Sequence, residues 1–174
     1  MARIAFLTYG ILLEPWDHPV SKGFVDRVEA VFSQAEQSTG FIDRHRGTEG
    51  QTWGPHAKSR FFDEQKHAVD IATLSLWCDL ESVCAFAYRG IHGEAFHLRR
   101  SWCVKPEWPT YAAWWVPDEH RPDWEEAYER HGYLHDNGPS ARVFNFKRPF
   151  DEAGNPAELD RGRLGELMKA NGHG

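Results

Sequence analysis

The feature of this sequence that most limits its fold is the presence of two short segments that are apolar on both sides. Residues 4–9 read Ile-Ala-Phe-Leu-Thr-Tyr, and residues 111–116 read Tyr-Ala-Ala-Trp-Trp-Val. Successive side chains of a strand point to opposite faces, so a strand that is apolar at consecutive positions is buried on both faces. The sequence therefore predicts a sheet whose inner strands are covered from both sides.

The remaining elements follow from the spacing of apolar residues and from helix caps. We expect helices over residues 19–39, 79–103 and 122–137, and strands over residues 41–45, 68–77 and 141–146. Gly90 and Gly93 lie in the middle of the second helix and predict a kink or a division into two parts. Residues 47–66 have no period and are expected to form a long loop.

The order of these elements predicts an α+β fold. A β-α-β-β-α-β order, followed here by one more helix and strand, is the split βαβ pattern of a ferredoxin-like antiparallel sheet. We expect one such domain over residues 1–148. Residues 149–174 form a polar C-terminal tail that is expected to be flexible or partly helical, through Leu159, Leu164 and Leu167.

The same topology places both helices on one face of the sheet. The other face would be open to water, yet the strands carry Phe6, Trp77 and the pair Trp114 and Trp115. We therefore expect a homodimer in which two copies pack sheet to sheet, as in a dimeric α/β barrel. The space between the sheet and the helices of each subunit is expected to form a ligand cavity.

Charge and composition exclude several classes of partner. The formal net charge of −6 gives no general electrostatic support for binding nucleic acid or an anionic membrane. The longest apolar runs, residues 83–88 and 111–116, are far shorter than the about 20 residues that a membrane span requires. We expect no membrane association, no nucleic-acid partner, and a partner that is neutral or small.

The N-terminal residues and the cysteines favour the cytoplasm. The chain lacks a basic segment followed by the apolar core of a secretion signal. Cys78, Cys84 and Cys103 are odd in number and lack CxxC spacing. We expect a reducing, cytoplasmic location.

A series of short motifs resembles one protein family. Its residues are Tyr88-Arg89-Gly90-Ile91-His92, Phe96, Arg99-Arg100 and Trp102. The series resembles the Tyr-x-Ser-x-His, Arg-Arg and Trp-Phe pattern of the bacterial domain-of-unknown-function family 3291. Residues 114–117, Trp-Trp-Val-Pro, and the turn at residues 138–140 before 144–146 look like the second half of that family.

The resemblance covers about residues 3 to 148 and implies the dimeric α/β-barrel superfamily. This superfamily also includes antibiotic-biosynthesis monooxygenases, haem-degrading enzymes, chlorite dismutases and aldoxime dehydratases, so the resemblance implies no single reaction. Two positions depart from the family pattern. Gly90 stands where the family usually has serine, and Cys103 stands where it usually has an aromatic residue.

One helix stripe carries the candidate catalytic residues. Tyr88, His92, Phe96 and Arg99 are spaced so that they face the same side of a helix. An imidazole can take or give a proton near neutral pH, and a phenol and a guanidinium can stabilise an oxyanion. His92 is therefore the candidate base, with Tyr88 and Arg99 as its partners. In the structural alternative, His92 hydrogen-bonds the broken helix and Arg99 forms a surface ion pair.

Aromatic and small polar residues of the strands predict the walls of the site. Eight tryptophans exceed what a core of this size needs, which indicates a flat apolar ligand or a subunit interface. The adjacent Trp114 and Trp115 must point to opposite faces of their strand, so one of them belongs to the core. We expect the substrate-binding residues to be Trp77, Phe96, Trp114, Thr73 and Ser75.

These residues favour a small-molecule enzyme. The expected substrate is flat, apolar and polyketide- or phenol-like, and the expected chemistry is acid/base or cofactor-independent oxygen chemistry of the monooxygenase-like, isomerase, cyclase or lyase kind. Two alternatives stay open: a haem-binding protein with His92 as axial ligand, and a non-catalytic dimer that only holds a ligand.

Other cofactors are not expected. The sequence has no glycine-rich phosphate loop and no dinucleotide fingerprint. His131 and His135 are four residues apart, but the flanking acid of a HExxH site and a third ligand are missing, so no metal site is expected.

Overall fold

Four antiparallel strands form the sheet of this chain, whose computed structural model describes residues 2–47, 53–55, 57–88 and 90–171. Over these residues the strand order is β2-β3-β1-β4. The strands are β1 (Arg3–Leu12), β2 (Phe41–Arg44), β3 (Val69–Trp77) and β4 (Tyr111–Val116). This is the order of a ferredoxin-like sheet, so the predicted α+β architecture is confirmed at this level.

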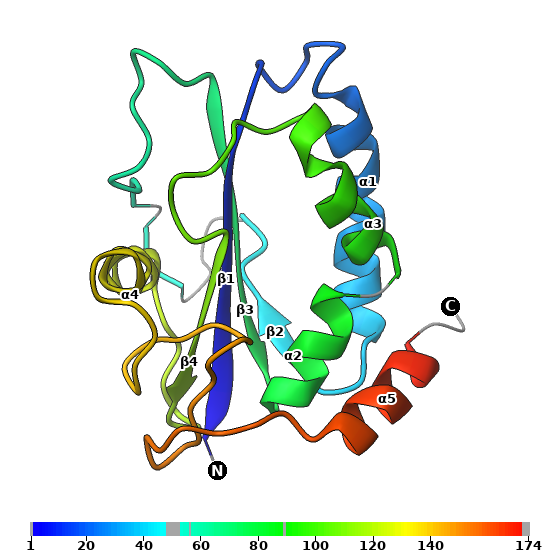
Figure 1. Cartoon of the computed structure of the whole chain (residues 1–174). Coiled ribbons are helices and arrows are strands. Elements are labelled where there is room, and N and C mark those ends of the chain that lie inside the picture. Colours follow the sequence, from blue (N-terminus) through cyan, green and yellow to red (C-terminus); the bar gives the residue numbers. More distant parts are fainter. Residues whose placement is uncertain (1, 48–52, 56, 89, 172–174) are drawn as a thin grey trace.

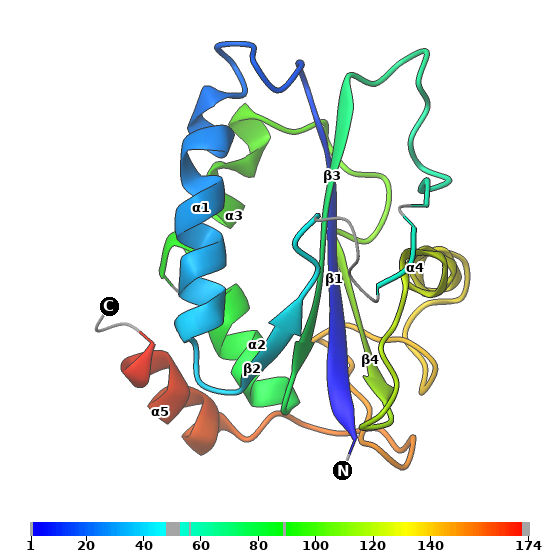
Figure 2. The same cartoon turned by 180° about the vertical axis from the view of Figure 1, so that it is seen from behind.

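Helices lie on both faces of the sheet (Figure 1 and Figure 2). One face carries α1 (Lys22–Gln37), α2 (Leu80–Ala87), α3 (Gly90–Leu98) and the short 3₁₀ helix η1 (Arg99–Ser101). The opposite face carries α4 (Trp124–Asn137), and α5 (Arg161–Ala170) packs against α2. In the part of the chain that the structure describes, none of these helices is long and apolar enough to cross a membrane.

Strand β1 is central, and both of its faces are buried. It pairs with β3 along one edge and with β4 along the other. Ile4 and Phe6 belong to the core beneath α2, whereas Ala5 and Leu7 belong to the core beneath α4. None of these four side chains is more than 2% exposed. The prediction that this segment is covered from both sides is confirmed.

Helix α4 and the long loop before β3 cover the face that was expected to meet a second copy. Trp124 and Tyr128 of α4 and Trp53 of the loop pack in one core with Leu7 and Leu74 of the sheet. All five side chains are buried. The reason for expecting a sheet-to-sheet homodimer therefore falls away, because this apolar face is already covered within one chain.

Residues 141–146 do not form the additional strand that was predicted. Phe144 exchanges two backbone hydrogen bonds with Ala113, of 3.0 and 2.8 Å, but this is a single bridge. Turns at residues 141–142 and 146–147 bend the chain away on either side. Alternation of apolar residues correctly sends Val143 and Phe144 to opposite cores, while the turns limit the pairing to one residue.

The second predicted helix is divided in two, and helix α5 packs against its first part, α2. The predicted division of the second helix is confirmed, since α2 and α3 are separate helices. Helix α5 docks on the first turn of α2, where the Arg163 guanidinium lies 2.5 Å from the Asp79 carboxylate and Glu81 accepts the Asp160 amide at 2.9 Å. Asp79 also caps α2 by accepting the Ser82 amide. The tail thus contains a docked helix.

Trp124→Ala is expected to lower the free energy of unfolding by about 3–5 kcal/mol, because it leaves a cavity between α4 and the sheet. Urea unfolding followed by circular dichroism measures the loss. Trp16→Ala is the control: Trp16 is 45% exposed, so its truncation should cost about 0.5 kcal/mol. Equal losses in the two variants would contradict the packing of α4.

Candidate functional site

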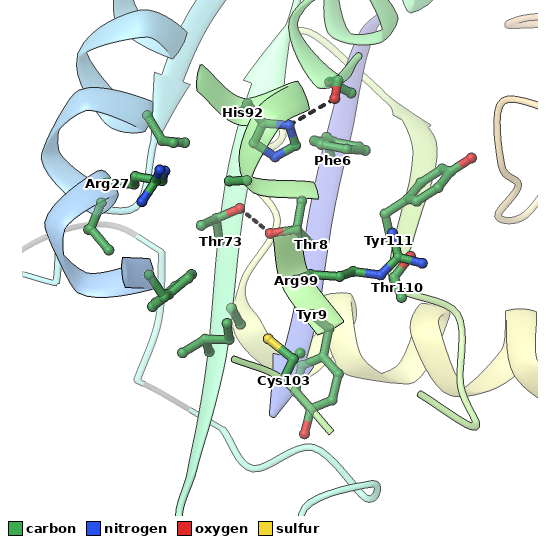
Figure 3. A pocket seen from close by; sticks show the side chains of 18 of the residues that line it. Phe6, Thr8, Tyr9, Arg27, Thr73, His92, Arg99, Cys103, Thr110 and Tyr111 are labelled. Carbon is green, nitrogen blue, oxygen red and sulfur yellow. Dashed lines mark hydrogen bonds between the residues drawn. The ribbon is translucent and has the colours of Figure 1, made fainter. Parts of the chain in front are cut away.

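A cavity of about 430 Å³ lies between the sheet and helices α1 and α3 (Figure 3). Its volume is that of a small-molecule site. Most of the side chains that line it are apolar, and they come from all layers of this half of the fold. Representative ones are Phe6, Phe24, Val28, Val31, Ile71 and Trp102. The cavity lies where the sheet topology led us to expect one.

The break between α2 and α3 orients one face of α3 toward this cavity. Gly90 has φ +59°, a left-handed conformation that L side chains rarely adopt, and a Cβ there would collide with the Gln34 amide group. A Cβ at Gly93 would lie 2.9 Å from the Tyr88 carbonyl oxygen. Gln34 of α1 accepts the backbone N–H of His92 at 3.3 Å. Glycine is therefore required where the chain turns from α2 into α3.

The His92 ring joins the helix break to the cavity. Its Nδ1 lies 2.9 Å from the carbonyl oxygen of Ala87, in the last turn of α2. A carbonyl only accepts, so Nδ1 carries the proton and Nε2 keeps its lone pair. Figure 3 shows the Nε2 side of the ring turned into the cavity that His92 lines. Nδ1 thus makes the contact of the structural alternative, while Nε2 stays available.

Burial keeps this imidazole neutral. Desolvation lowers the pKa of His92 below its ordinary value, and the hydrogen bond to Ala87 opposes this shift. The Phe86 ring, 4.6 Å away between centroids, forms part of its apolar surroundings. A neutral histidine with a free ring nitrogen in a cavity can accept a proton.

Two threonines place hydroxyl groups on the sheet side of the cavity. Thr8 and Thr73 are register partners in β1 and β3, and their hydroxyl oxygens are 2.6 Å apart (Figure 3). Further along β3, Ser75 also lines the cavity and accepts the indole N–H of Trp77 at 2.9 Å. Trp77 is fully buried behind Ser75, and its indole N–H positions the Ser75 hydroxyl group.

A pair of tyrosines forms the β4 side of the cavity. Tyr111 is hydrogen-bonded to Tyr88 and accepts the backbone N–H of Phe146 at 3.2 Å. Burial, followed by the contact with Tyr88, raises the pKa of Tyr111. Tyr88 itself is 43% exposed, so it lies at the rim rather than inside. Tyr111 therefore faces this site as a neutral phenol.

Three arginines also line the cavity. Arg27 of α1 donates to the Gly23 carbonyl at 2.8 Å and to Glu94 at 3.1 Å. Arg44 of β2 donates to Glu36 at 2.9 Å, and Arg99 lies in η1. Arg27 and Arg44 also lie over the rings of Trp102 and Phe32. Positive charge is thus brought to several sides of one cavity.

The structure brings most of the predicted site residues together, although from different elements. Tyr88, His92, Arg99, Thr73 and Ser75 all line the cavity. They do not share one helix stripe, because Tyr88 caps the end of α2, His92 is in α3 and Arg99 is in η1. The side chain of Phe96 lies outside what the structure describes.

Trp114 was expected to form a wall of the site and does not. It pairs with Ala5 and lies on the α4 side, where its indole N–H donates to Glu126 at 3.0 Å. Trp115 takes the other face, as the alternation of the strand requires, and donates to the Phe150 carbonyl. The split of the pair is confirmed, but neither ring is among the residues that line the cavity.

Sequence patterns missed Thr8, Tyr111, Arg27 and Trp102. Thr8 and Tyr111 lie on the same face as Phe6, which strand alternation alone could have indicated. Arg27 and Trp102 come from α1 and from the residue after η1, and they meet only in the folded chain. No local signal marks that pair.

His131 of α4 is a structural residue on the other face. It is fully buried, and its Nε2 lies 2.5 Å from the Pro109 carbonyl oxygen, which links α4 to the residues before β4. Burial is the main reason that the pKa of His131 is lowered from 6.5 to about 4. Within the described residues, no three His, Cys, Asp or Glu side chains lie close enough together to hold a metal ion.

Comparison with known families gives one match. The model of a family described as a domain of unknown function, DUF3291, matches residues 3–160. No curated protein and no solved structure was found to match the chain.

Gly90→Ala should destabilise the fold by about 1–2 kcal/mol, because alanine resists a left-handed backbone. Gly165→Ala is the matched control, since a Cβ there meets no atom within 4 Å in helix α5. That change should instead stabilise by up to about 1 kcal/mol. Urea midpoints of the two variants decide the point, and a stabilising Gly90→Ala would refute the role assigned to this glycine.

The stability of the chain should fall as the pH is lowered from about 6.5 to 4. Over this range the unfolded state protonates His131 and the folded state does not, because the folded pKa is about 4. The expected contribution is about 1.4 kcal/mol per pH unit. Urea unfolding at several pH values measures the slope, which His131→Gln should reduce. An unchanged slope in that variant would rule out the assignment.

Proposed function

Because the chain belongs to the family of domains of unknown function DUF3291, which assigns it no reaction, we propose that it acts through the cavity between the sheet and helices α1 and α3. The ligand is a flat, largely apolar organic molecule, and the reaction begins with the transfer of a proton to His92. The observation that carries this proposal is the neutral His92 ring, held by Ala87 through Nδ1 with Nε2 turned into the cavity.

His92 acts as the general base of the proposed reaction. Its Nε2 takes a proton from a carbon acid or a phenol, which breaks the C–H or O–H bond and leaves an enolate or phenolate. The same imidazolium returns the proton in an isomerisation, a cyclisation or an elimination. An electron-rich enolate or phenolate is also the species that would react with oxygen in cofactor-independent oxygen chemistry.

The oxyanion formed in this step needs donors, and the cavity supplies them. Arg99 and the Thr8–Thr73 pair line the same space as His92, and Tyr88 lies at its rim. Donors held in place by the fold stabilise charge that develops in a transition state. Arg99 and Tyr88 thus keep the oxyanion-stabilising role expected of them.

The walls of the cavity support a flat apolar ligand. Aromatic rings enclose it from several elements, including Phe24 of α1 and Trp102 after η1, whose centroids are 6.2 Å apart. Such side chains bury large apolar areas and favour ring-on-ring contacts. A polyketide- or phenol-like molecule has this shape.

The strand order and the three helices on one face support membership of the dimeric α/β-barrel superfamily as part of this proposal. A barrel dimer is not part of it, because α4 covers the face through which two sheets would meet. Any association of two copies would use another surface.

Haem is the second candidate, since the same ring geometry suits an axial ligand. A hydrogen bond from Nδ1 to a backbone carbonyl is typical of metal-binding histidines, and Arg27 and Arg99 could pair with the propionates. Haem would supply redox chemistry at the iron. A Soret band on adding haemin, lost in His92→Ala, would favour this candidate over the first.

The acid/base proposal predicts that the chain accelerates hydrogen–deuterium exchange at C1 of 2-tetralone, a flat bicyclic ketone. In D₂O at pH 7.5, proton NMR should show faster exchange than in buffer. His92→Ala should reduce the enzymatic rate on the order of 10²–10⁴-fold, as expected for a positioned base. His97→Ala, which changes an exposed histidine of the same helix, should keep it.

Two results would count against the proposal. Exchange no faster than in buffer, together with quenching of tryptophan fluorescence by 2-tetralone, would favour the non-catalytic ligand-binding alternative. Equal rates in the wild-type chain and in His92→Ala would exclude His92 as the base.

A further inference from the structure

We infer that the ligand of this cavity is an anion, a flat organic molecule whose carboxylate or acidic enolate group contacts Arg99 and the Thr8–Thr73 hydroxyl pair. The inference rests on the proposed function, and it adds the charge of the ligand and the place where that charge binds.

Arginines predominate among the charged groups that line the cavity, although the chain as a whole is acidic. The chain has a formal net charge of −6, yet the described residues that line the cavity include three arginines, Arg27, Arg44 and Arg99, and one carboxylate, Asp70. Guanidinium groups are always protonated in proteins. The carboxylates that pair with Arg27 and Arg44, those of Glu94 and Glu36, are not among the lining residues. Among the groups that line the cavity, positively charged ones therefore outnumber negatively charged ones.

The one lining carboxylate belongs to the opposite face of the sheet. Asp70 pairs with Ile11 in β1, and both lie on the side that α4 covers. Burial is the main reason that the pKa values of Tyr9 and Tyr128 on that side are raised, and the charge of Asp70 adds to the shift. On the side that faces α1 and α3, the charged groups that line the cavity are the arginines.

Cys103 and Tyr111, which also line the helix side of the cavity, carry no negative charge at neutral pH. Burial raises the pKa of Cys103 to about 11, although the nearby Arg99 opposes this shift, and burial also raises the pKa of Tyr111. His92 is neutral for the reason given above. An anionic group is then the ligand feature that complements the arginines lining the cavity.

Arg99 and the two threonines are polar groups of the wall that can donate hydrogen bonds to a ligand. Figure 3 shows Arg99 extending from η1 toward β4, where Thr110 and Tyr111 lie, with Thr8 and Thr73 on the sheet behind it. Thr8 and Thr73 have two hydroxyl protons, and the bond between them uses one. The second can be donated to a ligand oxygen, and the Arg99 guanidinium can donate two parallel hydrogen bonds to a carboxylate.

The apolar walls decide the rest of the ligand. Phe24, Val28 and Ile71 line the cavity and offer no polar partner. A fully polar anion such as phosphate would leave these surfaces uncovered, whereas a flat aromatic or conjugated acid covers them and places its one charged end at Arg99.

The test uses two probes that differ in charge and share one ring system, 2-naphthoate and 2-naphthamide. Their affinities for the full chain are measured by isothermal titration calorimetry at pH 7.5 and low salt. We expect 2-naphthoate to bind at least about tenfold more tightly, since a guanidinium–carboxylate pair is stronger than a neutral hydrogen bond. Arg99→Gln should remove this preference while leaving the affinity for 2-naphthamide unchanged, which also shows that the cavity is still formed.

Arg100→Gln is the matched control, because Arg100 is the exposed neighbour of Arg99 in η1 and does not line the cavity. It should keep the preference for 2-naphthoate. Thr73→Val should weaken 2-naphthoate more than 2-naphthamide, since it removes one hydroxyl of the pair and keeps the shape of the side chain.

The outcomes separate this inference from the proposed function. Equal binding of the two probes, or an equal loss of both in Arg99→Gln, would overturn the anion inference and leave the proposed reaction standing. A preference for 2-naphthoate without exchange that depends on His92 would support the inference and overturn the reaction. Binding of neither probe would overturn both the inference and the flat ligand class.

Discussion

The exclusion of water from both faces of β1 is the constraint on which the rest of this structure depends. A strand with apolar side chains at consecutive positions needs a layer on each side, and one sheet of four strands supplies neither. Helix α2 covers one face with Phe86 and its neighbours, and α4 covers the other with Trp124. The cavity occurs where α1 and α3 span the helix side of the sheet without filling it.

The position of His92 follows from this arrangement in two steps. Glycine at position 90 lets the chain leave α2 and start α3 in a new direction. The Gln34 side chain of α1 then accepts a hydrogen bond from the backbone N–H of His92, in the first turn of α3. The Ala87 carbonyl, in the last turn of α2, then accepts a hydrogen bond from the Nδ1–H group. Backbone geometry therefore sets the tautomer of the ring. Because Nδ1 donates its proton to the hydrogen bond with Ala87, Nε2 is the nitrogen that can accept a proton from a ligand.

Local periodicity predicted the elements but not always their partners. The strands over residues 4–9, 68–77 and 111–116, the divided helix and the strand order all follow from alternation, glycine placement and topology. The expected stripe on one helix face does not exist, because the break redirects α3. Tyr88, His92 and Arg99 nevertheless line the same cavity. Trp114 was assigned to the wrong face because alternation separates it from Trp115 without saying which face carries the cavity. Residues 141–146 alternate like a strand, but turns on both sides leave a single bridge to the sheet, between Phe144 and Ala113.

The early position of β1 has a consequence for how the chain folds. Among the strands of this sheet it is the first to be synthesised, whereas its two neighbours, β3 and β4, and the helix α4 that covers it follow much later. Until then its apolar faces and both hydrogen-bonding edges have no native partner, so contacts of long sequence separation must form before it is protected. A chain released before β4 has formed would keep an edge of this apolar strand unpaired, and an unpaired edge is open to aggregation.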